Sequence, residues 1–251
     1  MNKHDAAINL SVLHTNTRHD SGPKHVTGTA EYIDDMAEPL GTMHAYLGLS
    51  TKPHAEVLGM DFTDVLNTPG VIGVLTNADV PGALDISSAH VHDEPLFADG
   101  VVHFWGQPIF AVIAETRDQA RRAAQLAKVD YRDLSFFTDV RSAQAAGGKE
   151  VTKPLKLERG DVEAGMASAP RRLKGAITIG GQGLFYLEGQ IALAIPGEDE
   201  DVIIHSSTQH PSELQLIVAN ALGIRQNAVT VNLRRMGGGF GAKETQGNLF
   251  A

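Results

Sequence analysis

The sequence has no cysteine among its 251 residues. Disulfides, thiolate nucleophiles and cysteine-ligated iron–sulfur clusters are therefore excluded from this polypeptide. The absence does not identify a compartment, because a cysteine-free chain survives in oxidising and in reducing surroundings alike.

Long apolar runs and an excess of basic residues are also absent. No apolar stretch approaches the ~20 residues that a membrane-spanning helix needs, and the polar start from Met1 to Asp5 has no signal-peptide core. Lys and Arg number 21 against 30 Asp and Glu, giving a formal net charge of −9. We therefore expect a cytoplasmic protein that binds neither membranes nor nucleic acid.

Glycine, in contrast, is concentrated close to the last residues. Four glycines occupy the five positions from Gly237 to Gly241, interrupted only by Phe240, and they follow a strand-like stretch at residues 228–233. Glycine has no Cβ to hold a ligand away and tolerates positive φ. Backbone N–H groups displayed after a strand suit an anionic or phosphorylated ligand.

Three interpretations of this glycine run compete. Gly237, Gly239 and Ala242 match the dinucleotide-binding pattern G-x-G-x-x-A, but that pattern needs a complete strand–helix–strand unit and an acidic residue roughly 20 positions onward. A phosphate-binding P-loop does not fit, since Lys243 follows alanine and precedes glutamate. The plainest alternative is a turn that packs a strand against the next element.

A second segment favours a ligand site. Residues 202–205 read as a strand, a polar turn precedes Pro211, apolar positions spaced three and four apart follow, and Gly223 ends the helix. This is a strand–helix–strand unit that leads to the strand at 228–233. If the two strands are parallel neighbours, the polar turn and the glycine run lie at the same carboxyl edge, where ligands bind in open α/β sheets.

These segments together resemble the molybdenum-binding subunit of the xanthine dehydrogenase family of molybdenum hydroxylases, in its amino-terminal part. The resemblance extends from about His19 to the last residue, with the motifs in the family's order. The motifs that carry it are Gly28-Thr-Ala-Glu-Tyr-Ile-Asp-Asp35, Asp93-Glu-Pro-Leu-Phe-Ala98, Gly106-Gln-Pro-Ile-Phe-Ala-Val-Ile-Ala114, Ile179-Gly-Gly-Gln182, Phe185-Tyr-Leu-Glu188, Ser207-Thr-Gln209 and Met236-Gly-Gly-Gly-Phe-Gly-Ala-Lys-Glu244.

The resemblance implies an α+β protein, in which an α/β hammerhead domain precedes the first part of a molybdenum cofactor-binding α/β domain. Combined with the pattern of apolar residues and breakers, it predicts a polar segment at 1–21, the hammerhead domain at 22–137, a linker at 138–159 and the cofactor-binding portion at 160–251. Within the last portion we expect a short helix at 161–169 and strands at 173–179 and 191–195.

The resemblance also assigns site residues around a molybdenum–molybdopterin cofactor. Gln209 matches the glutamine that hydrogen-bonds the molybdenum oxo ligand, and Gly239, Phe240 and Gly241 match the loop whose backbone N–H groups lie against the same ligand sphere. Gln209 and Phe240 would thus face the molybdenum. Glu244 matches a substrate-side glutamate that hydrogen-bonds a purine and stabilises charge on its ring. Its alternative is a carboxylate favoured by a helix dipole.

Two features depart from the family pattern. Gly183 and Leu184 replace an acidic residue and a histidine that commonly follow Gly-Gly-Gln. The family's general-base glutamate and a substrate-binding arginine belong to sequence beyond Ala251, so we expect the isolated chain to be inactive.

The function implied is hydroxylation of hypoxanthine or xanthine with water-derived oxygen. Electrons would pass to 2Fe–2S and FAD sites on a partner chain, in a hetero-oligomer that also contains the remainder of the molybdenum subunit. Glu244 favours xanthine, because relatives acting on aldehydes usually carry an apolar residue there. The alternatives are another molybdenum hydroxylase for aldehydes or N-heterocycles, a non-catalytic assembly module, and a nucleotide-binding domain.

One further cluster has metal-binding residue types. In an extended segment, His90 and His92 would project to the same face, next to Asp93 and Glu94. No third histidine is close in sequence, so an exposed loop is the interpretation we favour.

Overall fold

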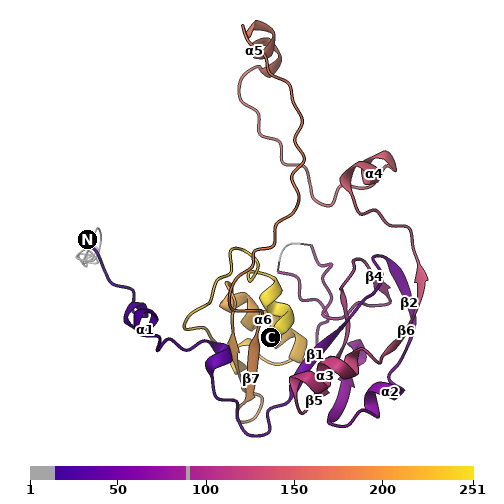
Figure 1. The fold of residues 1–251 in the computed structure, drawn as a ribbon, viewed down its shortest axis with the longest axis vertical. Helices are drawn as coiled ribbons and strands as arrows, with labels where there is room; N and C mark the ends of the chain where they lie inside the picture. Colours follow the sequence, from indigo (N-terminus) through magenta and orange to yellow (C-terminus); the bar gives the residue numbers. More distant parts are fainter. Residues whose placement is uncertain (1–14, 89–90) are drawn as a thin grey trace, which may run out of the picture.

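The computed structural model describes residues 15–88 and 91–251. It has two α+β units that lie side by side, one built from the first half of the chain and one from its last quarter (Figure 1). A long excursion of the chain connects them.

The first unit contains two three-stranded antiparallel sheets. One has the order β1-β5-β3 and the other β4-β2-β6. Its strands are β1 (His44–Leu49), β2 (Ala55–Asp61), β3 (Val71–Leu75), β4 (Val101–Val102), β5 (Pro108–Ala114) and β6 (Lys128–Asp133), and its helices are α2 (Thr63–Leu66), η2 (Asn77–Asp79) and α3 (Arg117–Ala124).

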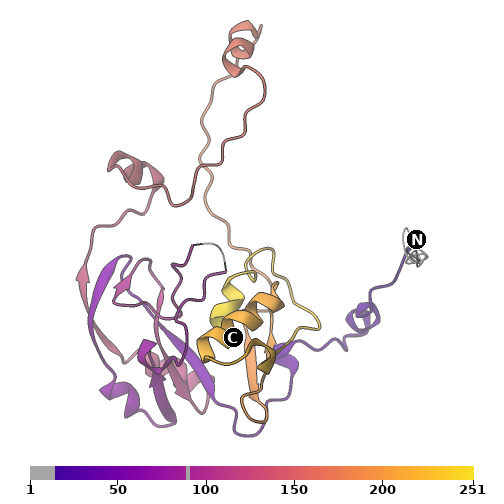
Figure 2. The same cartoon turned by 180° about the vertical axis from the view of Figure 1, so that it is seen from behind.

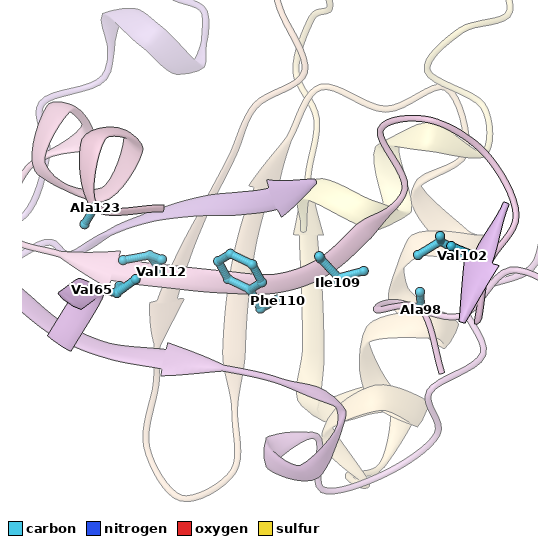
Figure 3. Close-up of a cluster of buried hydrophobic side chains, with 8 residues drawn as sticks. Val65, Ala98, Val102, Ile109, Phe110, Val112 and Ala123 are labelled. Carbon is cyan, nitrogen blue, oxygen red and sulfur yellow. The ribbon is translucent and has the colours of Figure 1, made fainter. Parts of the chain in front are cut away.

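Strand β5 forms the centre of the first core. Its sequence is an almost continuous apolar run, and such a run suits a strand covered on both faces. Phe110 and Val112 are buried, and α3 presents Ala123 to the same interior (Figure 3). Gly48 on β1 leaves room for the Phe110 ring, since a Cβ at position 48 would lie 2.1 Å from the ring.

The second unit contains the strand–helix–strand arrangement predicted from the sequence. The sheet has the order β7-β8-β9, with β8 and β9 parallel and β7 antiparallel to β8. Its elements are β7 (Ala192–Pro196), β8 (Val202–Ser206), α6 (Pro211–Leu222), η3 (Gln226–Ala228), β9 (Val229–Asn232) and η4 (Gln246–Phe250).

Local sequence explains where α6 begins and ends. Pro211 occupies the first turn, where a missing N–H costs nothing, and Gly223 adopts φ +68° at the carboxyl end. Leu214 and Val218 of this helix pack on Ile204 of β8 and Val229 of β9. The two strands are parallel neighbours, which is the condition under which the loops that follow them lie at the same edge.

The connection between the units projects away from both of them. It carries α4 (Val140–Ala145) and, at its tip, α5 (Val162–Ser168) (Figure 1, Figure 2). The short helix expected at 161–169 is therefore confirmed. The strand expected at 173–179 is wrong: these residues form no strand, and Leu173, Ile177 and Ile179 are exposed. The apolar residues do alternate, but among the described residues no neighbouring strand pairs with this segment.

Two sets of contacts tie the second unit to earlier parts of the chain. The backbone N–H groups of Gly82 and Ala83 donate to the Ala221 and Asn220 carbonyls at 2.9 and 2.8 Å. Near the start, α1 (Gly22–Thr27) and η1 (Ile33–Asp35) flank a segment that Arg235 holds, through a 2.7 Å bond from Nη1 to the Glu31 carbonyl. Within the described ranges, no helix is both long and apolar enough to cross a membrane.

Candidate functional site

Two loops meet at the carboxyl edge of the second sheet. Ser207, Thr208 and Gln209 directly follow β8, and residues 233–245 follow the parallel strand β9. The Gln209 backbone N–H donates to the Lys243 carbonyl at 2.7 Å, which joins the two loops directly. The structure therefore brings the predicted residues Gln209, Gly239, Phe240, Gly241 and Glu244 into one region.

The side-chain amide of Gln209 has a defined orientation. Its Oε1 accepts hydrogen bonds from the backbone N–H groups of Gly241 and Lys243, at 2.9 and 3.3 Å. Because only the amide oxygen can accept, these two donors identify it, and the NH₂ group points the other way. Gln209 is exposed, so its NH₂ group can donate to a ligand outside the loop.

The glycine loop is closely packed against Gln209 on one side. A Cβ at Gly239 would lie 2.6 Å from Gln209 Oε1, so only glycine fits there without displacing the amide. Gly238 and Gly241 have φ of +101° and +93°, and Phe240 itself has φ +53°. This left-handed backbone is costly for an aromatic residue. It turns the Phe240 side chain outward, where it is 73% exposed.

Gly241 differs from the expectation in one respect. Its N–H is already bonded to Gln209 Oε1. The N–H predicted to face a ligand is therefore engaged within the protein, where it holds the Gln209 amide.

Glu244 lies just past this loop and faces solvent. Its side chain is 55% exposed, with Oε1 3.9 Å from Nε2 of His210. It precedes Thr245, the residue that caps the 3₁₀ helix η4, and it is not in the first turn of an α-helix. Because Glu244 lies outside the first turn of η4, the structure does not support the alternative of a first-turn carboxylate favoured by a helix dipole.

Buried charges beneath the loop were missed from the sequence. Lys243 and Glu188 are buried together with Ser207, and Lys243 Nζ lies 3.4 Å from Glu188 Oε2. Both residues are within motifs of the family, but lysine is almost always solvent-exposed, so the sequence alone favours a surface position. The partners are 55 residues apart, and no periodic pattern connects them.

Other predicted features lie away from this region. Gln182, Gly183 and Leu184 are exposed in the projecting connection. His90 lies outside the described residues, and His92 pairs with Asp85 at 2.5 Å. In the ranges that the structure describes, no group of three or more His, Cys, Asp or Glu residues could hold a metal ion.

The donors at this edge fit a cofactor that carries its metal with its own ligands. They are an amide NH₂ group and a tightly turned glycine backbone, which bind oxo or phosphate oxygens. At Gly237, a Cβ would lie 2.4 Å from Glu188 Cβ, so the first glycine of the loop packs tightly against Glu188. Gln209 and the loop would contact the cofactor, while Glu244 extends beyond them.

Comparison with known proteins connects this geometry to a family. The a/b hammerhead domain of aldehyde oxidase and xanthine dehydrogenase matches residues 27–135, and a molybdopterin cofactor-binding domain matches residues 144–251. Xanthine dehydrogenase of Oryza sativa is 39% identical over 98% of this chain. Aldehyde oxidase 3 of Rattus norvegicus is 36% identical over 93% of it. The chain spans only 18% and 17% of these two relatives.

Solved structures give the same result at the level of the fold. Aldehyde oxidoreductase from Desulfovibrio gigas superposes with a TM-score of 0.78 at 27% identity, over 92% of this chain and 28% of that one. Quinoline 2-oxidoreductase from Pseudomonas putida gives 0.76 at 26% identity, over 94% and 32%. With its hammerhead domain followed by a molybdopterin cofactor-binding domain, the chain belongs to the molybdenum hydroxylase family of xanthine dehydrogenases and aldehyde oxidases.

Proposed function

We propose that this chain forms one wall of the molybdenum site in a xanthine dehydrogenase-like hydroxylase that oxidises hypoxanthine or xanthine, in purine catabolism. The observation that carries the proposal is the orientation of Gln209. Two loop N–H groups fix its amide oxygen, which leaves its NH₂ group free to donate outward, beside an exposed carboxylate at Glu244.

The cofactor contributes the redox chemistry. When bound, the molybdenum–molybdopterin group would supply the transfer of a water-derived oxygen to an electron-poor ring carbon and the uptake of two electrons. This chain's residues bind and orient. Gln209 would donate an N–H to an oxygen of the bound group, Gly239 and Gly241 keep that amide in place, and the exposed Phe240 ring would face the group.

Glu244 is the proposed substrate-binding residue. Its carboxylate is exposed, and its Oε1 lies 3.9 Å from Nε2 of His210. Such a carboxylate can accept a hydrogen bond from a purine N–H and thereby stabilise charge that develops on the ring. The aldehyde carbonyl offers no such donor. This is the reason for preferring a purine.

The composition of the chain supports a proposal about its partners. With no cysteine, this polypeptide has no thiolate to ligate an iron–sulfur cluster. We propose that electrons leave through 2Fe–2S and FAD sites on a partner chain, in a cytoplasmic hetero-oligomer that includes the remainder of the molybdenum subunit.

A second candidate is oxidation of aldehydes or N-heterocycles. It is supported by the similar identity to rat aldehyde oxidase 3 and by the two superposing structures, whose names refer to an aldehyde and to quinoline. Competing assays of xanthine, an aldehyde and quinoline on the protein purified from its native host separate the two. Preference for either of the last two over xanthine would replace the purine proposal.

The residue-level test is Glu244→Ala in the same preparation. We expect turnover of xanthine to fall about 10²-fold or more, as for loss of one charge-stabilising contact, with molybdenum content per protein unchanged. Glu198→Ala, in the exposed turn between β7 and β8, is the matched control. Parallel loss of turnover and molybdenum would make Glu244 a structural residue.

A further inference from the structure

Lys243 combines complete burial with a position between two residues of the proposed site. It follows Gly241 and Ala242 and directly precedes Glu244, yet its side chain is 0% exposed. A buried ammonium needs strong partners, because removal from water costs several kcal/mol per ion. The loop that contains it has no regular secondary structure. Lys243 therefore offers the loop an internal anchor that its own backbone does not supply.

The ammonium of Lys243 has a partner for each of its protons. Nζ lies 2.7 Å from the Glu188 carbonyl oxygen, 2.7 Å from Ser207 Oγ and 3.4 Å from Glu188 Oε2. It also lies 4.7 Å from the centroid of the Tyr186 ring, within the range of a cation–π interaction. All these groups come from outside the glycine loop. The loop's last portion is thus anchored to the residue that follows β8 and to the segment that precedes β7.

Glu188 anchors the other end of the same loop. Its Oε2 accepts from the Gly237 backbone N–H at 2.7 Å and from Ser207 Oγ at 2.5 Å. The Glu188 N–H donates to the Gly237 carbonyl at 3.3 Å. One carboxylate oxygen therefore contacts the first glycine of the run, and the same residue contacts the lysine that ends it.

The backbone of Lys243 transmits this anchoring to Gln209. Its carbonyl accepts from Gln209 N at 2.7 Å and from Thr208 Oγ1 at 3.3 Å, and its N–H donates to Gln209 Oε1. Any shift of residue 243 therefore moves both the main chain and the side-chain amide of Gln209.

We propose that Lys243 and Glu188 are positioning residues, whose buried ion pair holds the two ends of the glycine loop and thereby orients the Gln209 amide. Neither residue needs to touch cofactor or substrate. That this orientation serves a bound cofactor rests on the proposed function, whereas the anchoring of the loop does not.

The test compares three variants of the protein purified from its native host: Lys243→Met, Glu188→Gln and the double variant. Lys243→Met keeps the length of the side chain and leaves Glu188 uncompensated. The double variant removes both charges, and the amide that replaces the Glu188 carboxylate still offers an oxygen to Gly237. Lys128→Met is the matched control, because Lys128 forms an exposed ion pair with Asp64 at 2.7 Å.

The first readout is amide hydrogen exchange, which needs no cofactor chemistry. We expect amides of residues 237–243 to exchange about 10-fold faster or more in both single variants, with amides of β5 unchanged. In the double variant we expect the melting temperature to recover toward that of the unmodified protein, while fast exchange in the loop persists. The double variant leaves no buried charge unpaired, so stability recovers, but the hydrogen bonds of the Lys243 ammonium remain lost.

The second readout is steady-state kinetics on xanthine. We expect kcat to fall roughly 10- to 100-fold in the double variant, as for a displacement of about 1 Å at a reacting centre, with KM within about twofold. A merely structural role would reduce the amount of active protein and leave kcat per bound molybdenum unchanged.

Unchanged exchange at residues 237–243 in Glu188→Gln, the milder variant, overturns the proposal. So does a double variant that regains both melting temperature and loop protection, since charge neutrality would then be the whole role. A protein that lacks molybdenum and xanthine turnover would refute the proposed function, and faster loop exchange in the variants would still establish the anchor.

Discussion

At the scale of single residues, the glycine loop at 237–241 makes contacts that leave no room for a Cβ at two of its glycines. Gly239 lies against the Gln209 amide, and Gly237 lies against Glu188. The sequence indicated that Gln209 and the glycine run would meet if the strands before them were parallel neighbours, and the structure meets this condition. It did not predict the buried Lys243, since nothing in a sequence indicates that a lysine has found a carboxylate, a hydroxyl and a carbonyl inside a protein.

Gly239→Ala tests this fit. The added Cβ would lie 2.6 Å from Gln209 Oε1 and 3.0 Å from the terminal methyl of Met236, so the amide must move. We expect a loss of about 1–3 kcal/mol in the free energy of unfolding, measured by urea denaturation, and a lower molybdenum content. Gly180→Ala is the control, because a Cβ there has open space. If Gly239→Ala matched that control in both measurements, the close approach of Gly239 to Gln209 would affect neither stability nor molybdenum content.

At the scale of elements, what could be predicted from the sequence depends on whether an element is determined by its own residues or by a neighbouring strand. The unit of β8, α6 and β9 was predictable because its start and stop residues, Pro211 and Gly223, act locally. The strand expected at 173–179 was not formed, although Leu173, Ile177 and Ile179 alternate as a strand should. A strand exists only against a neighbouring edge, and an edge is not encoded in the segment itself.

The contact between α6 and the first unit also belongs to this scale. A Cβ at Gly82 would lie 2.0 Å from the Asn220 carbonyl oxygen and 2.7 Å from the Gly223 nitrogen. We expect Gly82→Ala to break the bonds from Gly82 and Ala83 to the end of α6, at a cost of about 1–3 kcal/mol. Faster hydrogen exchange at these two amides would report it.

The control for this junction is Gly73→Ala on β3, where a Cβ meets no atom within 4 Å. Equal unfolding free energies for Gly82→Ala and Gly73→Ala would mean that this contact between the two units contributes nothing to stability.

At the scale of the whole molecule, the described residues form two hydrophobic cores that have no buried residue in common. One surrounds Phe110 and Val112 of β5, and the other surrounds Leu214 of α6 and Ile204 of β8. Composition predicted two units, because a breaker-rich segment without clear periodicity separates two sets of apolar patterns. How firmly the units are coupled depends on a few backbone bonds between residues far apart in sequence, and these were not predictable.

Separate cores predict separable losses of stability. Phe110→Ala empties the centre of the first core and should cost about 3–5 kcal/mol, and Leu214→Ala should cost about 2–5 kcal/mol in the second. Hydrogen exchange in low denaturant, read at amides of β5 and of β8, assigns each loss to a unit. We expect Phe110→Ala to accelerate exchange mainly in β5 and Leu214→Ala mainly in β8, while Phe136→Ala, at an exposed ring, changes neither. Equal acceleration of both strands by either core variant would instead mean that the junction at Gly82 makes the molecule a single cooperative unit.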